Sequence, residues 1–184
     1  MLTYLYHMEN ENENENEEVY KRKIIMKKVE NFKVYCDGAC EPNPGIGGYC
    51  SVIFKTEDIS PRVIIRGGDK TTTNNRMEIM GVLCALEYIK EASNIVVFTD
   101  SQYVSNSLNI WLANWIKKHK TMKNMDLWNK IWLLKKKHYV KAVWIRGHNG
   151  NFYNEFADSI SIEVIDKVNK SKKSIYKNVK VLIK

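Results

Sequence analysis

The chain has 184 residues, 44% of them hydrophobic, an ordinary composition for one soluble domain with a substantial core. Its formal net charge is +8. No uncharged run is long enough to span a bilayer, and the first eight residues lack the basic and apolar regions of a secretory signal, which argues against a membrane protein and a secreted protein. We expect an intracellular, cytoplasmic protein with no membrane partner, and a nuclear or viral setting stays open.

The charge is unevenly distributed along the chain. Residues 1–20 hold six glutamates and no lysine or arginine, so the rest of the chain has 29 basic residues against 21 − 6 = 15 acidic ones, or +14. Such an excess of positive charge over residues 21–184 suits a polyanionic partner, although solubility alone would also explain it.

The four cysteines do not form a zinc-binding pattern, because they make no paired CxxC units and have no histidine close by. Cys36, Cys50 and Cys84 lie in apolar runs and are expected to be small core residues in a reducing compartment. Cys40 lies in a predicted loop, where a functional role stays open.

The two ends of the chain differ from its middle. Residues 9–18, ENENENENEE, are of low complexity without apolar periodicity, which predicts a disordered tail over residues 1–30 that includes the basic segment KRKIIMKK. Residues 170–184 are rich in lysine and are expected to form a loosely attached C-terminal tail. One folded domain is therefore expected over residues 31–169.

Between the tails, strand-like and helix-like segments follow one another in a definite order. The predicted strands are residues 32–37, 48–55, 62–67, 94–100 and 140–147. Ile79, Val82, Leu83 and Leu86 recur at helical spacing, which predicts a helix over residues 74–92. Further helices are expected at residues 101–108, 127–137 and 153–168. This order predicts an α/β fold, a mixed five-stranded sheet flanked by helices.

Acidic residues lie at the ends of several predicted elements. Asp37 ends the first strand, Asp100 ends the fourth, and Glu78 lies in the first turn of the first helix. Asp158 lies in the final helix, beyond a glycine-containing loop with His148. Open α/β sheets bind ligands at the carboxyl ends of their strands. Carboxylates gathered there repel one another, and Mg²⁺, which prefers oxygen ligands, would remove that repulsion.

Each of these acids also has a structural explanation. Asp100 precedes Ser101 and would cap a helix, and Glu78 near a helix start is favoured by the helix dipole. Asp158 could lie on a solvated helix face, and Asp37 could open a turn. Taken singly, the structural explanation is the better one for each, but four acids at converging element ends favour a metal site.

Five motifs resemble those of ribonuclease H of type 1, in order and with family-like spacing over about residues 31–168. They are YCDGACEPNPGIGGY, TTTNNRMEIMGVLCALE, FTDSQYV, NMDLWNKIW and VWIRGHNGNFYNEFAD. The resemblance implies the ribonuclease H-like α/β fold, with strand order 3-2-1-4-5 and strand 2 antiparallel. In that order the first and fourth strands are neighbours.

The resemblance also implies an activity and its residues. It assigns Asp37, Glu78, Asp100 and Asp158 to metal binding and His148 to a mobile catalytic loop. The implied reaction is hydrolysis of the RNA strand of an RNA–DNA hybrid, leaving 5′-phosphate and 3′-hydroxyl ends. Two Mg²⁺ ions, with Mn²⁺ as a substitute, would activate water and stabilise the leaving oxygen, and Asp37 is the expected bridging ligand. His148 could help protons leave or assist product release, or be simply a surface loop histidine, as His7, His119 and His138 are expected to be.

The resemblance further implies contacts to the hybrid. The residues expected to contact nucleic acid are Cys40, Asn43, Asn74 and Gln102 on the RNA side, Asn75, Thr73, Asn124 and Trp111 on the DNA side, and Lys123 in a basic segment. Recognition of RNA would depend on its 2′-hydroxyls. Asn43 could also form a turn and Asn74 could cap a helix, roles that can coexist with contacts to a hybrid. Trp111 could equally belong to the core, as Trp115, Trp128, Trp132 and Trp144 are expected to do.

One departure from the family pattern bears on affinity. Residues 114–128 replace a longer basic protrusion found in many relatives, so hybrid binding could be weaker or could be supplied by the lysine-rich tails. The alternatives are a non-catalytic hybrid-binding module, a resolvase or integrase of the same fold, and a detached reverse-transcriptase domain. With every acid kept and no polymerase portion, a stand-alone, monomeric ribonuclease is preferred.

Overall fold

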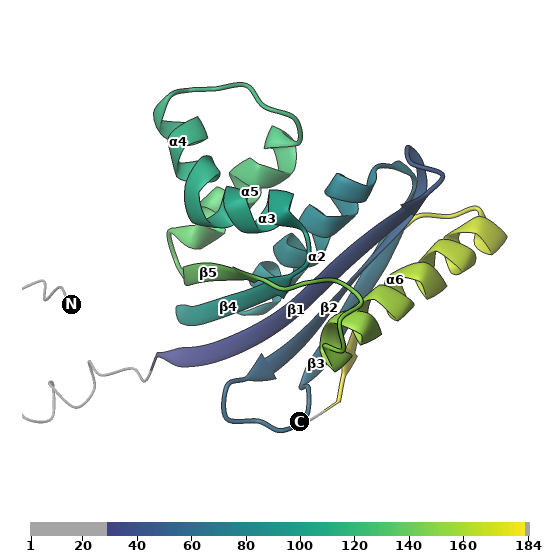
Figure 1. The fold of residues 1–184 in the computed structure, drawn as a ribbon, viewed down its shortest axis with the longest axis horizontal. Coiled ribbons are helices and arrows are strands. Elements are labelled where there is room, and N and C mark those ends of the chain that lie inside the picture. Colours follow the sequence, from purple (N-terminus) through teal and green to yellow (C-terminus); the bar gives the residue numbers. More distant parts are fainter. Residues whose placement is uncertain (1–28, 183–184) are drawn as a thin grey trace, which may run out of the picture.

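A computed structural model describes residues 29–182, a twisted sheet with helices on both faces (Figure 1). The strands are β1 (Glu30–Glu41), β2 (Gly45–Lys55), β3 (Val63–Thr72), β4 (Ser93–Thr99), β5 (Tyr139–Trp144) and β6 (Ile175–Val181). The helices are α2 (Asn74–Tyr88), α3 (Gln102–Asn106), the π-helical turn η1 (Ser107–Trp111), α4 (Leu112–Lys117), α5 (Met125–Lys135) and α6 (Phe152–Ser171). The expected N-terminal tail lies outside the described residues, apart from its last two.

The sheet has the order β5-β4-β1-β2-β3-β6. β1 is central, parallel to β4 on one side and antiparallel to β2 on the other. The predicted order of the first five strands and the antiparallel second strand are therefore confirmed. Because β1, β4 and β5 are parallel, their carboxyl ends meet at one edge of the sheet, where Asp37 and Asp100 were expected.

Two apolar cores lie on opposite faces of the sheet, which explains why its central strands are almost continuously apolar. The larger core packs α2, α3 and α5 against one face, and its largest fully buried side chain is Trp128. The smaller core packs α6 against the other face through residues such as Ala157 and Val164. Cys36, Cys50 and Cys84 are buried free thiols within these cores, as predicted.

The structure corrects the expected form of the C-terminal segment. The five expected strands gain a sixth, because residues 175–181 of the supposed loose tail pair antiparallel with β3. The pairing covers an edge of β3 that would otherwise present unpaired backbone groups to solvent.

Two single-residue expectations were also wrong. Trp144 is 45% exposed instead of buried, because it lies at the end of β5, and its Nε1 donates a hydrogen bond to the Asp100 carbonyl. His138, expected at the surface, is buried between α5 and β5, where neither ring nitrogen has a protein partner among the described residues. Burial lowers the pKa of His138, followed in effect by the charge of Lys137.

Within residues 29–182, no helix is both long enough and apolar enough to cross a membrane.

Candidate active site

The four acids come from four different elements that meet at the carboxyl edge of the sheet. Asp37 lies in β1, and Glu78 lies in the second turn of α2. Asp100 follows the last residue of β4, and Asp158 lies in α6. Asp37 and Glu78 are only 5% and 6% exposed, whereas Asp100 and Asp158 are half-buried. The site is thus a buried pair of carboxyls that opens toward a more accessible pair.

A close backbone approach brings Asp37 and Glu78 together. Gly38 follows Asp37 in β1, and a Cβ at that position would collide with the backbone of Met77 and the amide nitrogen of Glu78. Thr73 caps α2, since its Oγ1 accepts a hydrogen bond from the Arg76 amide at 3.4 Å. Glycine after Asp37 is therefore required for α2 to begin directly against β1.

Asp100 is held by two side chains that sequence reasoning did not single out. Asn154 Nδ2 donates a hydrogen bond to Asp100 Oδ2 at 3.2 Å, and Trp144 Nε1 donates to its carbonyl at 2.8 Å. A Cβ on Gly147 would collide with the same carboxylate oxygen. Asn154 lies one helical turn before Asp158, so the shared face of α6 was the available signal for its position.

The charges of the acids affect one another's pKa values. Burial, then the charges of Asp100 and Asp158, raises the pKa of Asp37 to about 8. Burial, followed by the Asp37 charge, raises the pKa of Glu78 well above its usual range. Burial and Asp100 also raise the pKa of Asp158, whereas nearby His148 lowers it. Without a counter-charge, this edge therefore holds protons at neutral pH.

The donors at this edge fit a hard divalent cation. The four side chains offer carboxylate oxygens, and the buried Oε2 of Glu78 has no hydrogen-bond partner within residues 29–182. Over the same residues, no three His, Cys, Asp or Glu side chains are arranged as a ready-made metal site. A closed set of ligands is not required for Mg²⁺, which typically takes only one or two protein carboxylates and keeps several waters.

Comparison with known proteins decides the family. Residues 29–165 match the family model described as RNase H. The chain belongs to the ribonuclease H family. It is 42% identical over 135 residues to ribonuclease HI of Helicobacter pylori (strain ATCC 700392 / 26695), a match that covers 72% of this chain and 92% of the relative. Ribonuclease H of Francisella tularensis subsp. novicida is 40% identical over 147 residues, covering 77% and 95%. Because it belongs to this family and resembles these relatives, the protein is an endoribonuclease of the hydrolase class.

Solved structures share the ribonuclease H fold at lower identity. LC9-RNase H1, described as a type 1 RNase H with the type 2 active-site motif, superposes with a TM-score of 0.70 at 22% identity, covering 84% of this chain and 78% of that one. LC11-RNase H1 in complex with an RNA/DNA hybrid superposes with a TM-score of 0.61 at 23% identity, covering 75% and 99%.

His148 lies in the loop of this ribonuclease H that leads from β5 to α6. It is exposed, with a left-handed backbone φ of 49°, and it is close enough to influence Asp158 electrostatically. Next to it, the Gly150 amide donates a hydrogen bond to Glu155 Oε1 at 2.8 Å, and Asn151 caps α6. His148 is thus held beside the acids by a loop attached firmly to α6 and open to solvent at its tip.

Three of the four residues expected to contact RNA lie together, near the carboxyl end of β1. Asn43, in the turn between β1 and β2, accepts a hydrogen bond from the Asn74 amide at 3.2 Å, which joins this turn to the start of α2. Cys40, near the end of β1, donates through Sγ to the Pro42 carbonyl at 3.3 Å. Asn43 therefore forms part of this turn, a role that we expected to be compatible with contact to a hybrid.

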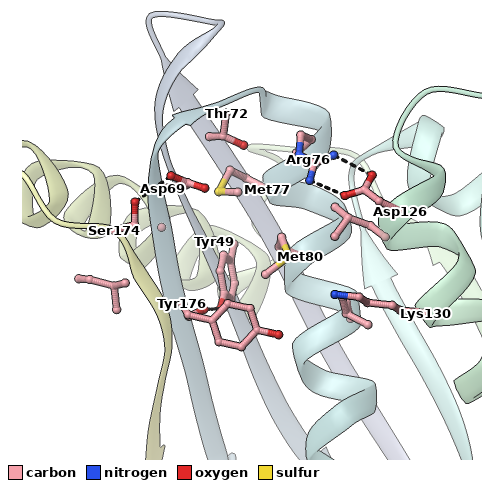
Figure 2. A pocket seen from close by; sticks show the side chains of 14 residues that line it. Tyr49, Asp69, Thr72, Arg76, Met77, Met80, Asp126, Lys130, Ser174 and Tyr176 are labelled. Atoms are coloured by element: carbon pink, nitrogen blue, oxygen red, sulfur yellow. Dashed lines mark hydrogen bonds and ion pairs between the residues drawn. The ribbon is translucent and has the colours of Figure 1, made fainter.

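The residues expected to hold a DNA phosphate are brought together by Arg76. Its guanidinium forms two hydrogen bonds to the Asp126 carboxylate, at 2.9 and 2.7 Å (Figure 2). A third hydrogen bond joins it to Asn124 Oδ1 at 3.3 Å. Asn124 takes a left-handed φ of 63° before α5, and its side chain reaches α2 through Arg76, whose amide also donates a hydrogen bond to Thr73 Oγ1. Sequence reasoning did not identify Arg76 or Asp126 as the link between these two elements.

The remaining expected contacts are spread over the surface near this edge. Asn75 and Gln102 are exposed at the starts of α2 and α3, and Lys123 is exposed in the loop between α4 and α5. Trp111 is 37% exposed and packs beside Tyr103 and Trp115, so one part of its ring is free for a ligand. The structure brings Cys40, Asn43 and Asn74 together and joins Thr73 and Asn124 through Arg76. The remaining expected contacts stay separate: Asn75, Gln102, Trp111 and Lys123.

Proposed function

We propose that this ribonuclease H hydrolyses the RNA strand of RNA–DNA hybrids with two divalent cations, leaving 5′-phosphate and 3′-hydroxyl ends. The observation that carries the proposal is the convergence of Asp37, Glu78, Asp100 and Asp158 at one sheet edge, where burial and mutual repulsion raise the pKa values of three of them. Such repulsion is removed when cations bind between the carboxylates. The hybrid in the LC11-RNase H1 structure supports the choice of substrate.

In this proposal the four acids would hold two Mg²⁺ ions, or Mn²⁺ in their place, with Asp37 as the central ligand. The bound ions would supply an activated water and charge stabilisation for the leaving 3′ oxygen. Asn154 fixes the orientation of Asp100 through its hydrogen bond, and its buried Oδ1 has no partner within residues 29–182. Because carboxyls must lose their protons to act as ligands, cation binding releases protons and strengthens as pH rises.

The other polar residues bind and orient the substrate in this proposal. Cys40, Asn43, Asn74 and Gln102 approach the RNA strand at its 2′-hydroxyls, which distinguish RNA from DNA. Asn75, Thr73, Asn124, Trp111 and Lys123 would hold the DNA strand. His148, exposed beside Asp158, would carry a proton away from the reacting phosphate or assist product release.

The test is incubation of an end-labelled RNA–DNA hybrid with the protein and Mg²⁺, alongside Asp37→Asn and a chelator control. We expect internal cleavage of the RNA strand only, lost in both controls, with product 5′ ends that are sensitive to phosphatase. Equal cleavage by Asp37→Asn, or equal attack on single-stranded RNA, would overturn the assignment.

A further inference from the structure

Part of the folded C-terminal segment lies outside the family match. The match ends at residue 165, whereas α6 continues to Ser171 and β6 covers Ile175–Val181. This addition is lysine-rich, because residues 167–184 include seven lysines and no acidic residue. Its function therefore does not follow from membership of the family.

The added strand is fixed to the body of the enzyme. The Tyr49 hydroxyl donates a hydrogen bond to the carbonyl of Tyr176, and Lys177 forms an ion pair of 3.0 Å with Glu87 on α2. Gly67 allows the two backbones to approach, since a Cβ there would collide with carbonyl oxygens of β6. The segment expected to be a tail is thus held in one place.

The connection from α6 to β6 is attached to the end of β3 nearest the candidate site. Ser174 Oγ donates to Asp69 Oδ1 at 2.8 Å and accepts from the Lys70 amide at 3.2 Å. Figure 2 shows Ser174 against Asp69, with Thr72 close by. Asp69 pairs with Gly47 in β2, just beyond the turn that carries Asn43. The connection therefore lies beside the residues expected to contact RNA.

Lysines on and beside this connection are exposed and form no ion pair within residues 29–182. They are Lys70, Lys170, Lys172 and Lys173. We call these four residues the C-terminal lysine platform. The only polar contact of their ammonium groups given within that range is from Lys172 Nζ to Asn169 Oδ1, at 2.8 Å.

A second basic region lies on the other side of the RNA-reading residues. Residues 118–124 connect α4 to α5 and include exposed Lys118, Lys120 and Lys123. This loop is the segment that is shorter than in many relatives. The two basic regions therefore flank the residues beside Asp37, and a rigid duplex passing over those residues would extend toward both.

We propose that the C-terminal lysine platform binds backbone phosphates of the RNA strand, outside the residues that read its 2′-hydroxyls. The proposal rests on the proposed function, and it adds a second electrostatic contact to the one from the short basic segment. The RNA strand is the nearer one, because Cys40 and Asn43 lie on the platform side, whereas Asn124 lies against α5. Each phosphate contact releases counterions, so the platform makes hybrid binding more dependent on salt.

The test compares salt dependence in two charge-matched triple variants, each made in an Asp37→Asn background that keeps the hybrid intact. One variant is Lys170→Gln, Lys172→Gln and Lys173→Gln. The other is Lys90→Gln, Lys136→Gln and Lys141→Gln, at exposed positions away from the carboxyl edge. The dissociation constant of a labelled hybrid of about 20 base pairs is measured by fluorescence anisotropy over a range of salt concentrations, where each lost phosphate contact flattens the slope by about 0.9.

We expect the platform variant to bind more weakly and to lose about two to three units of slope, while the matched variant loses less than about half a unit. With the acids intact, the platform substitutions should raise KM without changing kcat, and replacement of the same lysines by arginine should restore the parental slope. Equal slopes for the platform variant and the parent, or equal flattening in both triples, would overturn the inference.

The two proposals fail in different ways. A parent protein that does not cleave the hybrid in Mg²⁺ contradicts the proposed function and removes the substrate on which the platform depends. A parent that cleaves the hybrid, with a platform variant that keeps the parental slope, contradicts the platform alone.

Discussion

The carboxyl edge and the C-terminal strand differ in how their charges are arranged. At the carboxyl edge, Asp37 and Glu78 are buried beside like charges, and burial together with that repulsion raises their pKa values. At β6, Lys177 meets the opposite charge of Glu87, and the strand fills an edge of the sheet. The contrast shows that this fold keeps an unfavourable cluster of carboxyls at the candidate site, whereas the added edge strand brings stabilising contacts.

The largest expected effect is on catalysis at the carboxyl edge. Glu78→Gln should reduce hybrid cleavage by more than about 10²-fold, as expected for loss of one preorganised charged group at a reaction centre. When divalent cations are absent, the same change should raise the melting temperature at alkaline pH, because burial and the Asp37 charge make ionisation of Glu78 unfavourable and glutamine cannot ionise. Steady-state cleavage tests the loss of activity, and thermal melting in the presence of a chelator tests the gain in stability. A variant that is inactive and also less stable would contradict the description of the carboxyl edge as an unfavourable charge cluster.

A second prediction concerns divalent cations. Addition of Mg²⁺ at pH 8 should stabilise the protein by about 2.7 kcal/mol at a hundredfold excess over its Kd, because the ions bind only the folded state. Thermal melting should show this as a shift of about 2–4 °C per kcal/mol. Asp37→Asn should lose most of the shift, while Lys177→Met should keep it. Equal shifts in the parent and Asp37→Asn would place the cation elsewhere.

A third prediction removes β6. A chain ending at Lys173 should lose about 1–3 kcal/mol of folding free energy, from the buried apolar area and hydrogen bonds of the strand. Its kcat on saturating hybrid, measured well below the melting temperature, should stay within about twofold of the full chain, because the truncation touches none of the four acids. Chemical denaturation and cleavage assays check the two values. A large fall in kcat would show that β6 also supports the carboxyl edge.

The pH dependence of stability provides a fourth test. The pKa of Asp37 is about 8 in the folded protein and near 4 when unfolded, so the folded state binds more protons between these values. The unfolding free energy of the cation-free protein should therefore gain a downward contribution as pH rises from about 4 to 8. Asp37→Asn removes this contribution, so the stability difference between the variant and the parent should grow across that range. A constant difference would contradict the raised pKa.

The smallest expected effect is at the ion pair of β6. Lys177 and Glu87 are about three-quarters buried, with side-chain exposures of 23% and 28%. Removing the pair by Lys177→Met should cost up to about 1 kcal/mol, in keeping with a partly exposed ion pair. A double-mutant cycle with Glu87→Gln isolates the interaction. A coupling energy near zero would show that the backbone pairing alone holds the strand.

Much of the fold and the candidate site was predictable from local patterns. The helical spacing of Ile79, Val82 and Leu83 predicted α2, and apolar runs predicted the first five strands. The motifs around Asp37 and Glu78 gave the strand order and the meeting of the acids, which the sheet topology and the electrostatics bear out. Asn154 and Arg76 were not identified, because each acts through a partner far away in the chain.

The sequence by itself determined which residues are acidic at element ends, which segments are apolar, and to which family the motifs point. Only the tertiary structure decided that residues 175–181 form a strand, since a short lysine-rich segment becomes a strand when an open edge is available to pair with it. Here that edge is β3, and Gly67 allows the backbones to meet. Tertiary packing likewise fixed the raised pKa values of Asp37 and Glu78, because burial and the approach of like charges arise only after folding.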